Sequence, residues 1–448
     1  MRPLVMKFGG TSVADPPAIS RVVQIVTDTA ARGPVVVVVS AMAGITDELL
    51  RACRLARRGE VEEVDRLVDM IKGRHTACVE GLGVGDVREA IRGQCEELRA
   101  VLHSVAVLRE LTPRGEDRVV AAGELMSSRI VAAALGGTWV DARRAVVTDD
   151  RHPAVPLLPD TRAVAEREIQ PILDRGGIPV LGGFVGATAE GITTTLGRGG
   201  SDLSGSVVGA ALRAREIQIW TDVDGMLTAD PRVVNGAQLV PHLSFDEASE
   251  LAYFGAKVLH PSTILPAVQD GIPVRILNTR KPESEGSLIT PEAPPRPGAL
   301  TALASKRHVT VVDVTSPRML FAHGFLRRVF EVFERHATSV DVVTTSEVSV
   351  SVTLDDDRRL DGIVTDLRAL GEVHVDAGMA ILCAVGNTLQ REPHLAVRLI
   401  AALDGLPLRM VSQAASRRNL TLVLNDRDLP GAMTRLHEEF FSPVETSR

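Results

Sequence analysis

A glycine-rich stretch at residues 193–205, with the sequence T-T-T-L-G-R-G-G-S-D-L-S-G, has the residue types of an anion-binding loop. It contains three closely spaced glycines, Gly197, Gly199 and Gly200. Their backbone N–H groups can approach a ligand closely, and the helix predicted at 203–215 places its positive end beside them. Arg198 suits a carboxylate or phosphate bound through paired hydrogen bonds. Ser201 and Asp202 equally fit a plain helix cap after a glycine-rich turn.

A second candidate cation, Lys7, is followed closely by Gly9 and Gly10, so that a charge and backbone amides again occur together. Phosphoryl transfer needs charge placed around the moving oxygens and little covalent work by the protein. Carboxylates that can organise Mg²⁺ or these cations are Asp202, Asp222 and Asp230. The chain has no Walker A motif, no protein-kinase signature set and no G-x-G-x-x-G fingerprint. Taken singly, Lys7 also fits a surface lysine, Glu124 the solvated edge of a helix, and His260 a structural histidine.

Alternating strands and helices surround these residues. Residues 4–8 and the unbroken Val35–Val39 run predict strands, with a helix at 16–32 between them. Further strands are predicted at 178–181, 216–220 and 274–277. Small or polar residues follow all five strands: Gly9-Gly10, Ser40, Gly182-Gly183, Thr221-Asp222 and Asn278. Because the carboxyl ends of parallel strands meet in one crevice, we expect these residues to converge on one site.

The remaining regions have other patterns. Residues 45–135 have helical spacing throughout and predict a helical insertion, whereas the proline-rich segment before residue 300 predicts a linker. Two βαββαβ patterns follow, and Thr301–Ser305 can supply the strand that the second one lacks. The predicted fold is therefore α/β, a parallel-rich sheet between helices followed by two small βαββαβ domains. The predicted segments are a first domain at 1–282, a linker at 283–299, one small domain at 308–378, and a second at 300–307 and 379–448.

Composition predicts a soluble, cytoplasmic protein. The 448 residues are 45% hydrophobic and 24% charged, which is ordinary for globular proteins. The net charge of −7 argues against a nucleic-acid partner. Four cysteines without C-x-x-C spacing fit reduced thiols, and no stretch reaches the about 18 apolar residues of a membrane helix. We therefore expect neither a nucleic-acid partner nor a membrane partner.

Six motifs, in this order, resemble those of aspartate kinases in the amino-acid kinase superfamily. They are K-F-G-G-T-S at 7–12, G-E-L-M-S at 123–127, residues 193–202, W-T-D-V at 220–223, T-A-D-P-R at 228–232 and F-G-A-K-V-L-H-P at 254–261. The two C-terminal units resemble paired ACT domains, so the resemblance covers nearly the whole chain. S-V-D at 339–341 and T-T-S-E-V-S at 344–349 are most similar to the monofunctional, lysine-sensitive branch. Because the chain ends at Arg448, we expect no homoserine dehydrogenase domain.

This resemblance implies ATP-dependent phosphorylation of the side-chain carboxylate of L-aspartate to 4-phospho-L-aspartate, the first step of lysine, threonine and methionine biosynthesis. It implies that Lys7 and Asp202 are catalytic, that Arg198 binds the α-carboxylate of the substrate and that Glu124 binds its ammonium. Mg²⁺ would be bound mainly through ATP. The rest of the aspartate site would be Ser40, Thr46, Phe184, Gly199, Gly200 and Ser201. The nucleotide site would be Lys7, Gly9, Gly10, Thr221, Asp222, Leu227, Arg232, Lys257 and Val258.

Paired ACT domains further imply an amino-acid effector, lysine, and a homodimer or homotetramer, because exposed edges of small sheets usually pair. One wall of the effector site would be Met319, Gly324, Phe325 and Leu326. The other would be Ser339, Val340, Asp341, Thr345, Ser346 and Glu347. Two residues depart from the family pattern: Leu227 stands where tyrosine is frequent, and Ala322 where the lysine-sensitive branch tends to have a small hydroxyl residue. Threonine therefore stays open as an alternative effector.

Two other functions also stay open. One is an amino-acid kinase that acts on a different carboxylate, such as glutamate, although the ACT pair and Glu124 argue against it. The other is an amino-acid sensor whose kinase domain is inactive. The presence of Lys7, Arg198 and Asp202 argues against this function. ADP release measured with a panel of amino acids separates these functions.

Overall fold

The computed structural model describes residues 1–197, 199–255, 259, 261–296, 300–320, 323–389, 391–413 and 417–442. The chain forms two compact units. The first consists of Met1–Met226, Pro241–Phe245 and Val258–Ala293, and the second of Leu227–Val240, Asp246–Lys257 and Pro294–Arg448. Two short segments, 227–240 and 246–257, are thus grouped with the C-terminal part of the chain although both precede residue 282.

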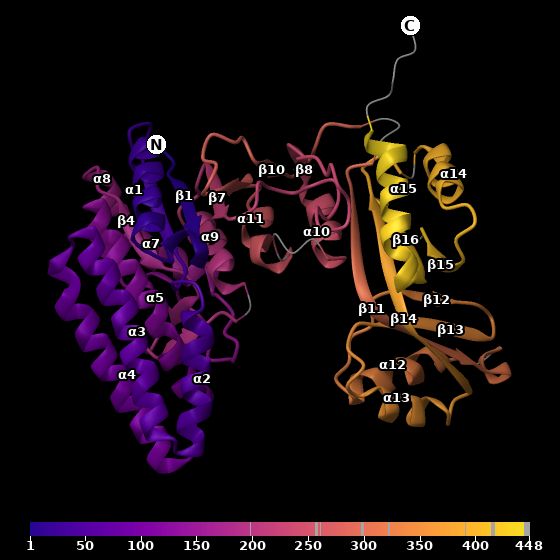
Figure 1. The fold of residues 1–448 in the computed structure, drawn as a ribbon, viewed down its shortest axis with the longest axis horizontal. Helices are drawn as coiled ribbons and strands as arrows, with labels where there is room; N and C mark the ends of the chain where they lie inside the picture. Colours follow the sequence, from indigo (N-terminus) through magenta and orange to yellow (C-terminus); the bar gives the residue numbers. More distant parts are fainter. Residues whose placement is uncertain are drawn as a thin grey trace, which may run out of the picture. The chain divides into compact units, whose positions relative to one another are not determined.

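An eight-stranded sheet organises the first unit, with the strand order β3-β4-β2-β1-β7-β9-β10-β8 (Figure 1). Its strands are β1 Leu4–Phe8, β2 Val35–Val39, β3 Thr138–Val140, β4 Pro179–Gly182, β7 Glu216–Thr221, β8 His242–Ser244, β9 Val274–Asn278 and β10 Ser287–Thr290. All neighbours from β3 to β9 are parallel, and β10 is antiparallel to β9. All five valines of β2 are buried, as expected of a strand covered on both faces.

Helices cover this sheet and form the predicted helical insertion. The insertion is α2 Ile45–Arg58, α3 Val61–Leu82, α4 Arg88–Leu108 and α5 Pro113–Leu135, which lie side by side in Figure 1. The others are α1 Pro16–Ala30, α6 Ala142–Ala145, α7 Leu158–Glu168, α8 Gln170–Asp174, α9 Gly200–Ala211 and α11 Leu265–Gln269. One hydrophobic core joins β1 and β2 with α1–α5. No helix in the described part of the chain is long and apolar enough to cross a membrane.

A small two-stranded sheet lies at the start of the glycine-rich loop. β5 (Val185–Ala187) pairs antiparallel with β6 (Thr193–Thr195). The loop then runs into α9, which begins at Gly200 rather than at the predicted residue 203. The earlier start arises because Gly199, at a φ of +71°, takes the left-handed N-cap position that a glycine adopts without strain.

The second unit contains an antiparallel six-stranded sheet in the order β12-β13-β11-β14-β16-β15. The strands are β11 Ala302–Thr315, β12 Val343–Thr345, β13 Ser349–Leu354, β14 Glu372–Val385, β15 Leu408–Ser412 and β16 Asn419–Asn425. Its helices are α12 Phe325–Arg335, α13 Leu360–Leu367, α14 Pro393–Ala402 and α15 Leu429–Phe441, together with nearly all of α10 Phe245–Tyr253. Strand β12 is only three residues long, although Asp341 and Val342 just before it also form backbone hydrogen bonds with Thr353 of β13.

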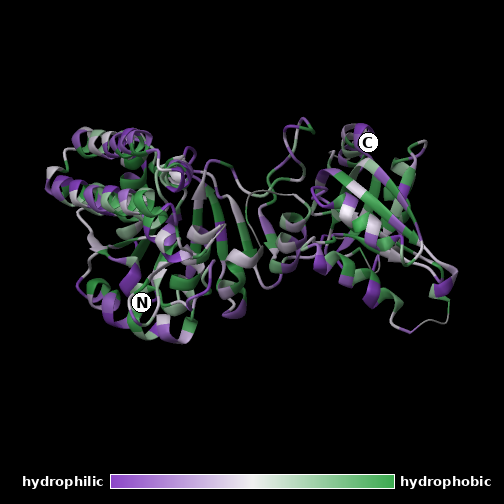
Figure 2. Ribbon diagram, turned by 90° about the horizontal axis from the view of Figure 1, so that it is seen from below, coloured by the Kyte–Doolittle hydropathy of each residue, from purple (hydrophilic) through white to green (hydrophobic). Residues whose placement is uncertain are grey.

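Two hydrophobic clusters lie along the six-stranded sheet. One joins α12 and α13 to β11 and β13, and the other joins α14 and α15 to β14 and β16. Figure 2 shows hydrophobic and hydrophilic residues alternating along the helices of both units, as amphipathic packing requires. The predicted α/β fold, with a parallel-rich sheet, a helical insertion and C-terminal antiparallel units, is confirmed.

Candidate active site

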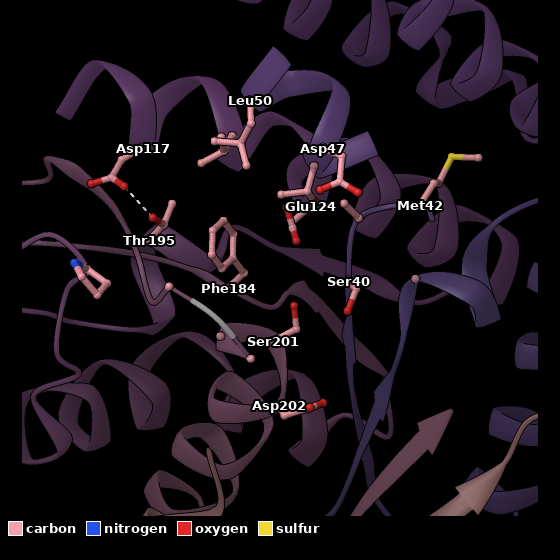
Figure 3. Close-up of a pocket in the computed structure, with 18 of the residues that line it drawn as sticks. Ser40, Met42, Asp47, Leu50, Asp117, Glu124, Phe184, Thr195, Ser201 and Asp202 are labelled. Carbon is pink, nitrogen blue, oxygen red and sulfur yellow. Dashed lines mark hydrogen bonds between the residues drawn. The ribbon is translucent and has the colours of Figure 1, made fainter. Parts of the chain in front are cut away.

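A cavity of about 790 Å³ lies in the first unit where β1 and β2 end, beside the start of α2, the middle of α5 and the glycine-rich loop (Figure 3). Ten residues predicted from the sequence line it: Lys7, Gly10, Ser40, Thr46, Glu124, Phe184, Gly199, Gly200, Ser201 and Asp202. They come from segments nearly 200 positions apart in the chain. The structure therefore brings together most of the predicted aspartate and phosphoryl-transfer residues.

Lys7, the penultimate residue of β1, is buried and forms an ion pair. Its Nζ lies 2.6 Å from Oδ1 of Asp202, in the first turn of α9. Helix α9 approaches β1 closely at Gly205, where an added Cβ would lie 3.2 Å from the Cβ of Lys7. Asp202 is thus not the helix N-cap; its carboxylate fixes an ammonium group at the cavity. A buried cation held by one carboxylate can still donate to a ligand anion, because an ammonium has three hydrogen-bond donors.

Glu124, in the middle of α5, is only 3% exposed. Its Oε2 has no hydrogen-bond partner among the described residues. Burial raises the pKa of this carboxyl group to about 8, although backbone hydrogen bonds and the charge of Lys7 act in the opposite direction. An unpaired buried carboxyl group is costly, and a ligand cation would remove that cost. Glu124 is therefore not the solvated helix edge that its sequence context also allowed.

The glycine-rich loop has fewer free amides than its sequence suggests. The N–H of Gly200 donates to the carbonyl of Gly197, and the N–H groups of Asp202 and Leu203 donate to the carbonyl of Gly199. These hydrogen bonds stabilise the tight entry into α9 and leave less of its first turn available for an anion. Arg198 lies outside the described residues.

Phe184 adopts a left-handed conformation, with a φ of +64°, between β4 and β5. Such strain in a residue other than glycine persists only where the surroundings hold it, commonly at ligand sites. Here the N–H of Phe184 donates to Ser204 Oγ of α9 at 2.8 Å, and its carbonyl accepts from the N–H of Leu196. In Figure 3 its ring lies in the cavity lining between Thr195 and Glu124.

Ser40 and Thr46 line the cavity near the end of β2. The N–H of Ser40 donates to the carbonyl of Phe8, and its own carbonyl accepts from Ser127 Oγ at 2.8 Å. Ser127 lies one turn after Glu124 on α5, so the helix that carries the buried acid also holds the end of β2.

Several lining residues were missed in the sequence, among them three acids and a histidine: Asp47, Glu116, Asp117 and His152. Asp117 precedes Glu124 by seven residues, so that both lie on one face of α5, and this spacing is the signal that would have found it. The hydroxyl of Thr195 donates to Oδ1 of Asp117 at 2.5 Å, and His152 Nδ1 lies 3.1 Å from the same oxygen. Figure 3 shows the first of these contacts.

The predicted nucleotide residues do not join this cavity as a group. Thr221 ends β7 and Asp222 follows it; the carbonyl of Thr221 accepts from the N–H of Thr279 after β9, and neither residue is part of the cavity lining. Gly9, also outside the lining, donates its N–H to the carbonyl of Trp220. The five predicted strand ends thus lie along one edge of the sheet, but of the small or polar residues predicted there only Gly10 and Ser40 line this cavity.

The remaining predicted nucleotide residues lie elsewhere. Leu227 and Arg232 belong to the second unit, in which Arg232 pairs with Asp230 at 2.7 Å. Lys257 and Val258 lie outside the described residues, as do His260 and Ala322. Near the end of β7, Asp224 accepts hydrogen bonds from Asn278 and from Lys281 Nζ, at 2.5 and 2.7 Å.

The predicted effector residues all lie in the second unit. Met319, Gly324, Phe325 and Leu326 precede or begin α12, whereas Ser339, Val340, Asp341, Thr345, Ser346 and Glu347 lie before, in or after β12. Oδ1 of Asp341 lies 2.9 Å from Lys306 Nζ and accepts from the hydroxyl of Tyr253 at 3.2 Å. Its Oδ2 is buried without a hydrogen-bond partner among the described residues. Lys306 and Tyr253 were missed because both contacts are distant in sequence.

Comparison with known proteins gives matches over nearly the whole chain. Residues 2–278 match the amino acid kinase family, and residues 382–440 match an ACT domain. The chain is 40% identical to chloroplastic aspartokinase 3 of Arabidopsis thaliana, over 98% of this chain and 81% of that protein. It is 37% identical to the lysine-sensitive aspartokinase 3 of Escherichia coli strain K12, over 98% of this chain and 99% of that protein.

Solved structures give the same result. The complex of E. coli aspartokinase III with aspartate and ADP, called the R-state, matches with a TM-score of 0.81 and 36% identity. The complex of the same protein with lysine and aspartate, called the T-state, matches with a TM-score of 0.83 and 37% identity. Each match covers 98% of this chain and 99% of the other.

Proposed function

This chain belongs to the aspartokinases of the amino acid kinase family, and we propose that the cavity of its first unit is where ATP phosphorylates the side-chain carboxylate of L-aspartate. The product is 4-phospho-L-aspartate, the start of lysine, threonine and methionine biosynthesis. One observation carries the assignment of the site. A buried carboxyl group with an unpaired oxygen, Glu124, and a buried ion-paired ammonium, Lys7, line the same cavity.

Glu124 binds the substrate ammonium in this proposal. The empty site holds a carboxyl group whose pKa burial has raised to about 8, and an incoming ammonium lowers that pKa by charge pairing. Part of the energy of pairing is therefore used to ionise the acid. An uncharged ligand cannot supply that energy, so the site selects a molecule with a cationic group.

Lys7 stabilises the phosphoryl group during transfer. Its ammonium is held by Asp202 in the first turn of α9, so that it does not have to be reorganised as negative charge develops. Arg198 follows Gly197 in the loop, and we propose that it binds the α-carboxylate of aspartate. Ser40, Thr46, Phe184, Gly199, Gly200 and Ser201 complete the substrate pocket.

ATP is proposed to lie toward Thr221 and Asp222, at the end of β7, with Gly9 and Gly10 near its phosphates. Leu227, Arg232, Lys257 and Val258 are proposed as further contacts. No group of three or more metal-ligating side chains occurs among the described residues. Asp202 and Asp230 are already paired with Lys7 and Arg232. These pairings favour Mg²⁺ bound mainly by the phosphates of ATP, where it would neutralise their charge.

Lysine is the proposed inhibitor, and its site is proposed around Asp341 in the second unit. The buried Oδ2 of Asp341, which has no hydrogen-bond partner among the described residues, supports this proposal, because it is an acceptor for an ammonium group. An effector inhibits by binding an inactive arrangement more tightly than an active one. The proposed ACT domains are residues 308–378, and 300–307 with 379–448. The two separate hydrophobic clusters of the second unit support that division.

We further propose a homodimer or homotetramer formed through the six-stranded sheet, of which β12 and β15 are the edge strands. A cytoplasmic location is proposed as well. All four cysteines are buried free thiols, which fits a reducing compartment.

ADP release tests the function directly. The enzyme is supplied with Mg-ATP and, in turn, aspartate, glutamate and other amino acids, each with and without lysine or threonine. We expect ADP release with aspartate alone among the amino acids and inhibition by lysine. Release with glutamate instead would identify a different amino-acid kinase, and no release with any amino acid would refute the enzymatic assignment.

A further inference from the structure

A cluster on the cavity wall, built around the buried side chains of Asp117 and Thr195, has no role in the mechanism above. It consists of Asp117 on α5, Thr195 at the end of β6, and His152. We propose that Asp117 is a positioning residue, which fixes the glycine-rich loop relative to α5 so that the loop binds aspartate. This inference rests on the proposed function, because it concerns how the substrate pocket is kept in register.

Asp117 is a buried carboxylate with partners on two other segments. It is 3% exposed, and its Oδ1 accepts from the hydroxyl of Thr195 at 2.5 Å. The same oxygen lies 3.1 Å from His152 Nδ1. A carboxylate in such a place is tolerated only with partners of good geometry. The positions of Thr195 and His152 relative to α5 are therefore linked to one buried group.

Both partners lead directly to Gly197, which begins the loop. Thr195 precedes Gly197 by two residues, and its carbonyl accepts from the N–H of Ala154 at 2.9 Å. Pro153, next to His152, packs so closely on Gly197 that an added Cβ would lie 2.7 Å from Pro153 Cβ. Three parts of the chain thus pack together beside Gly197 at the start of the loop: the Asp117 carboxylate, residues 152–154 and the end of β6.

Helix α5 then fixes two parts of the pocket at once. Glu124, the proposed ammonium acceptor, and Asp117 lie on the same helix face, seven residues apart. Gly199, Gly200 and Ser201, which follow the supported residues, are proposed to contact the rest of aspartate. A shift of the loop by about 1 Å would leave Glu124 in place and misplace the other contacts, with a cost on the order of 10²-fold or less. We therefore expect the loss mainly in aspartate binding.

Removing the hydrogen bond from either side tests the inference. Asp117→Ala and Thr195→Val should each raise the KM for aspartate by about tenfold, with the KM for ATP within about twofold and kcat within about threefold of wild type. Asp117→Asn and Thr195→Ser keep an acceptor and a hydroxyl, so both should stay near the wild-type KM. The double variant Asp117→Ala with Thr195→Val should be no worse than Asp117→Ala alone, because both remove one interaction.

Glu116→Gln is the matched control. Glu116 lies beside Asp117 in the cavity lining, with its Oε1 3.9 Å from His152 Nε2. Its KM values should stay within about twofold of wild type. An unchanged aspartate KM in Asp117→Ala and Thr195→Val would overturn the inference. An equal loss in both KM values and in kcat, together with a lowered melting temperature, would also overturn the inference. It would mean that Asp117 and Thr195 support the structure as a whole. An inactive wild-type enzyme would instead refute the proposed function.

Discussion

Two buried carboxyl groups, one in each unit, differ in how they are prepared for an incoming ammonium group. Glu124 has one oxygen without a partner among the described residues, and its pKa is raised to about 8 by burial. Asp341 also has one unpaired buried oxygen, but its other oxygen is held by Lys306 and Tyr253. Lys306 also reaches Asp355, at 2.9 Å. Burial lowers the pKa of Lys306, but its hydrogen bonds to Asp341 and Asp355 outweigh this and raise it.

Because of this difference, we expect the two sites to bind their ligands in different ways. No described cation forms an ion pair with Glu124, so pairing with a ligand ammonium couples substrate binding to its ionisation. Asp341 already has a lysine of the chain itself beside it, so that a free lysine must share the carboxylate or displace that side chain toward Asp355. A substrate site whose acid has no direct ion pair among the described residues favours selectivity for a cationic ligand. An effector site in which Lys306 already pairs with Asp341 favours weaker lysine binding, because two ammonium groups compete for one carboxylate.

The largest expected effect concerns catalysis in the first unit and leaves lysine binding to the second unit unchanged. Lys7→Ala removes the cation from the reacting centre, so kcat should fall by about 10²- to 10³-fold. Lysine binding to the second unit should be unchanged, since Lys7 belongs to the first unit. Steady-state ADP release and calorimetric titration with lysine measure the two quantities. A kcat within about threefold of wild type would exclude Lys7 from catalysis.

A smaller effect is expected when the competitor is removed. Lys306→Met leaves Asp341 buried without its counter-ion, which is strongly unfavourable until a ligand ammonium replaces it. The lysine concentration for half-inhibition should fall, on the order of tenfold, with uninhibited activity unchanged. Lys306→Arg, which keeps the charge, is the control and should behave more like wild type. If Lys306→Met instead needs more lysine for half-inhibition, Lys306 helps to build the site rather than competing for it.

The smallest expected effect is the pH dependence of substrate capture. Below pH 8 Glu124 is mainly the neutral acid in the empty site, because burial raises its pKa to about 8. The ionised form pairs with an ammonium, so kcat/KM for aspartate should rise about threefold from pH 7.5 to 8.5. Glu124→Gln cannot ionise and should lose that rise while binding aspartate less well. The same rise in Glu124→Gln as in wild type would assign the titration to another group.

Much of the first unit was predictable because its signals are local. The valine run of β2 and the small residues after β1, β2 and β4 are adjacent in sequence to the strands they end. The burial of Glu124 was left open, because the sequence also allowed the solvated edge of a helix at this position. The hydrogen bond that supports the glycine-rich loop could not be predicted, because Asp117 and Thr195 are 78 residues apart. Their contact follows from packing rather than from a motif.

The second unit was harder to predict in detail. The pattern assigned Thr301–Ser305 to one small domain and residues from 308 onward to the other, whereas the single strand β11 runs through both. Its register against β14 shifts around Lys306 and Val309, and His308 between them has a φ of +58°. That local distortion breaks the alternation of side chains by which a continuous strand is recognised. The contact of Lys306 with Asp341 has no local signal either, since 35 residues separate them.

Cross-titration of two variants tests the central claim most directly, namely that two acids serve two different amino acids. Wild type, Glu124→Gln and Asp341→Asn are titrated with aspartate and with lysine in the ADP-release assay. We predict that Glu124→Gln raises the aspartate KM and keeps the wild-type lysine response, whereas Asp341→Asn loses lysine inhibition and keeps the wild-type aspartate KM. Equal changes in both responses in either variant would contradict the account.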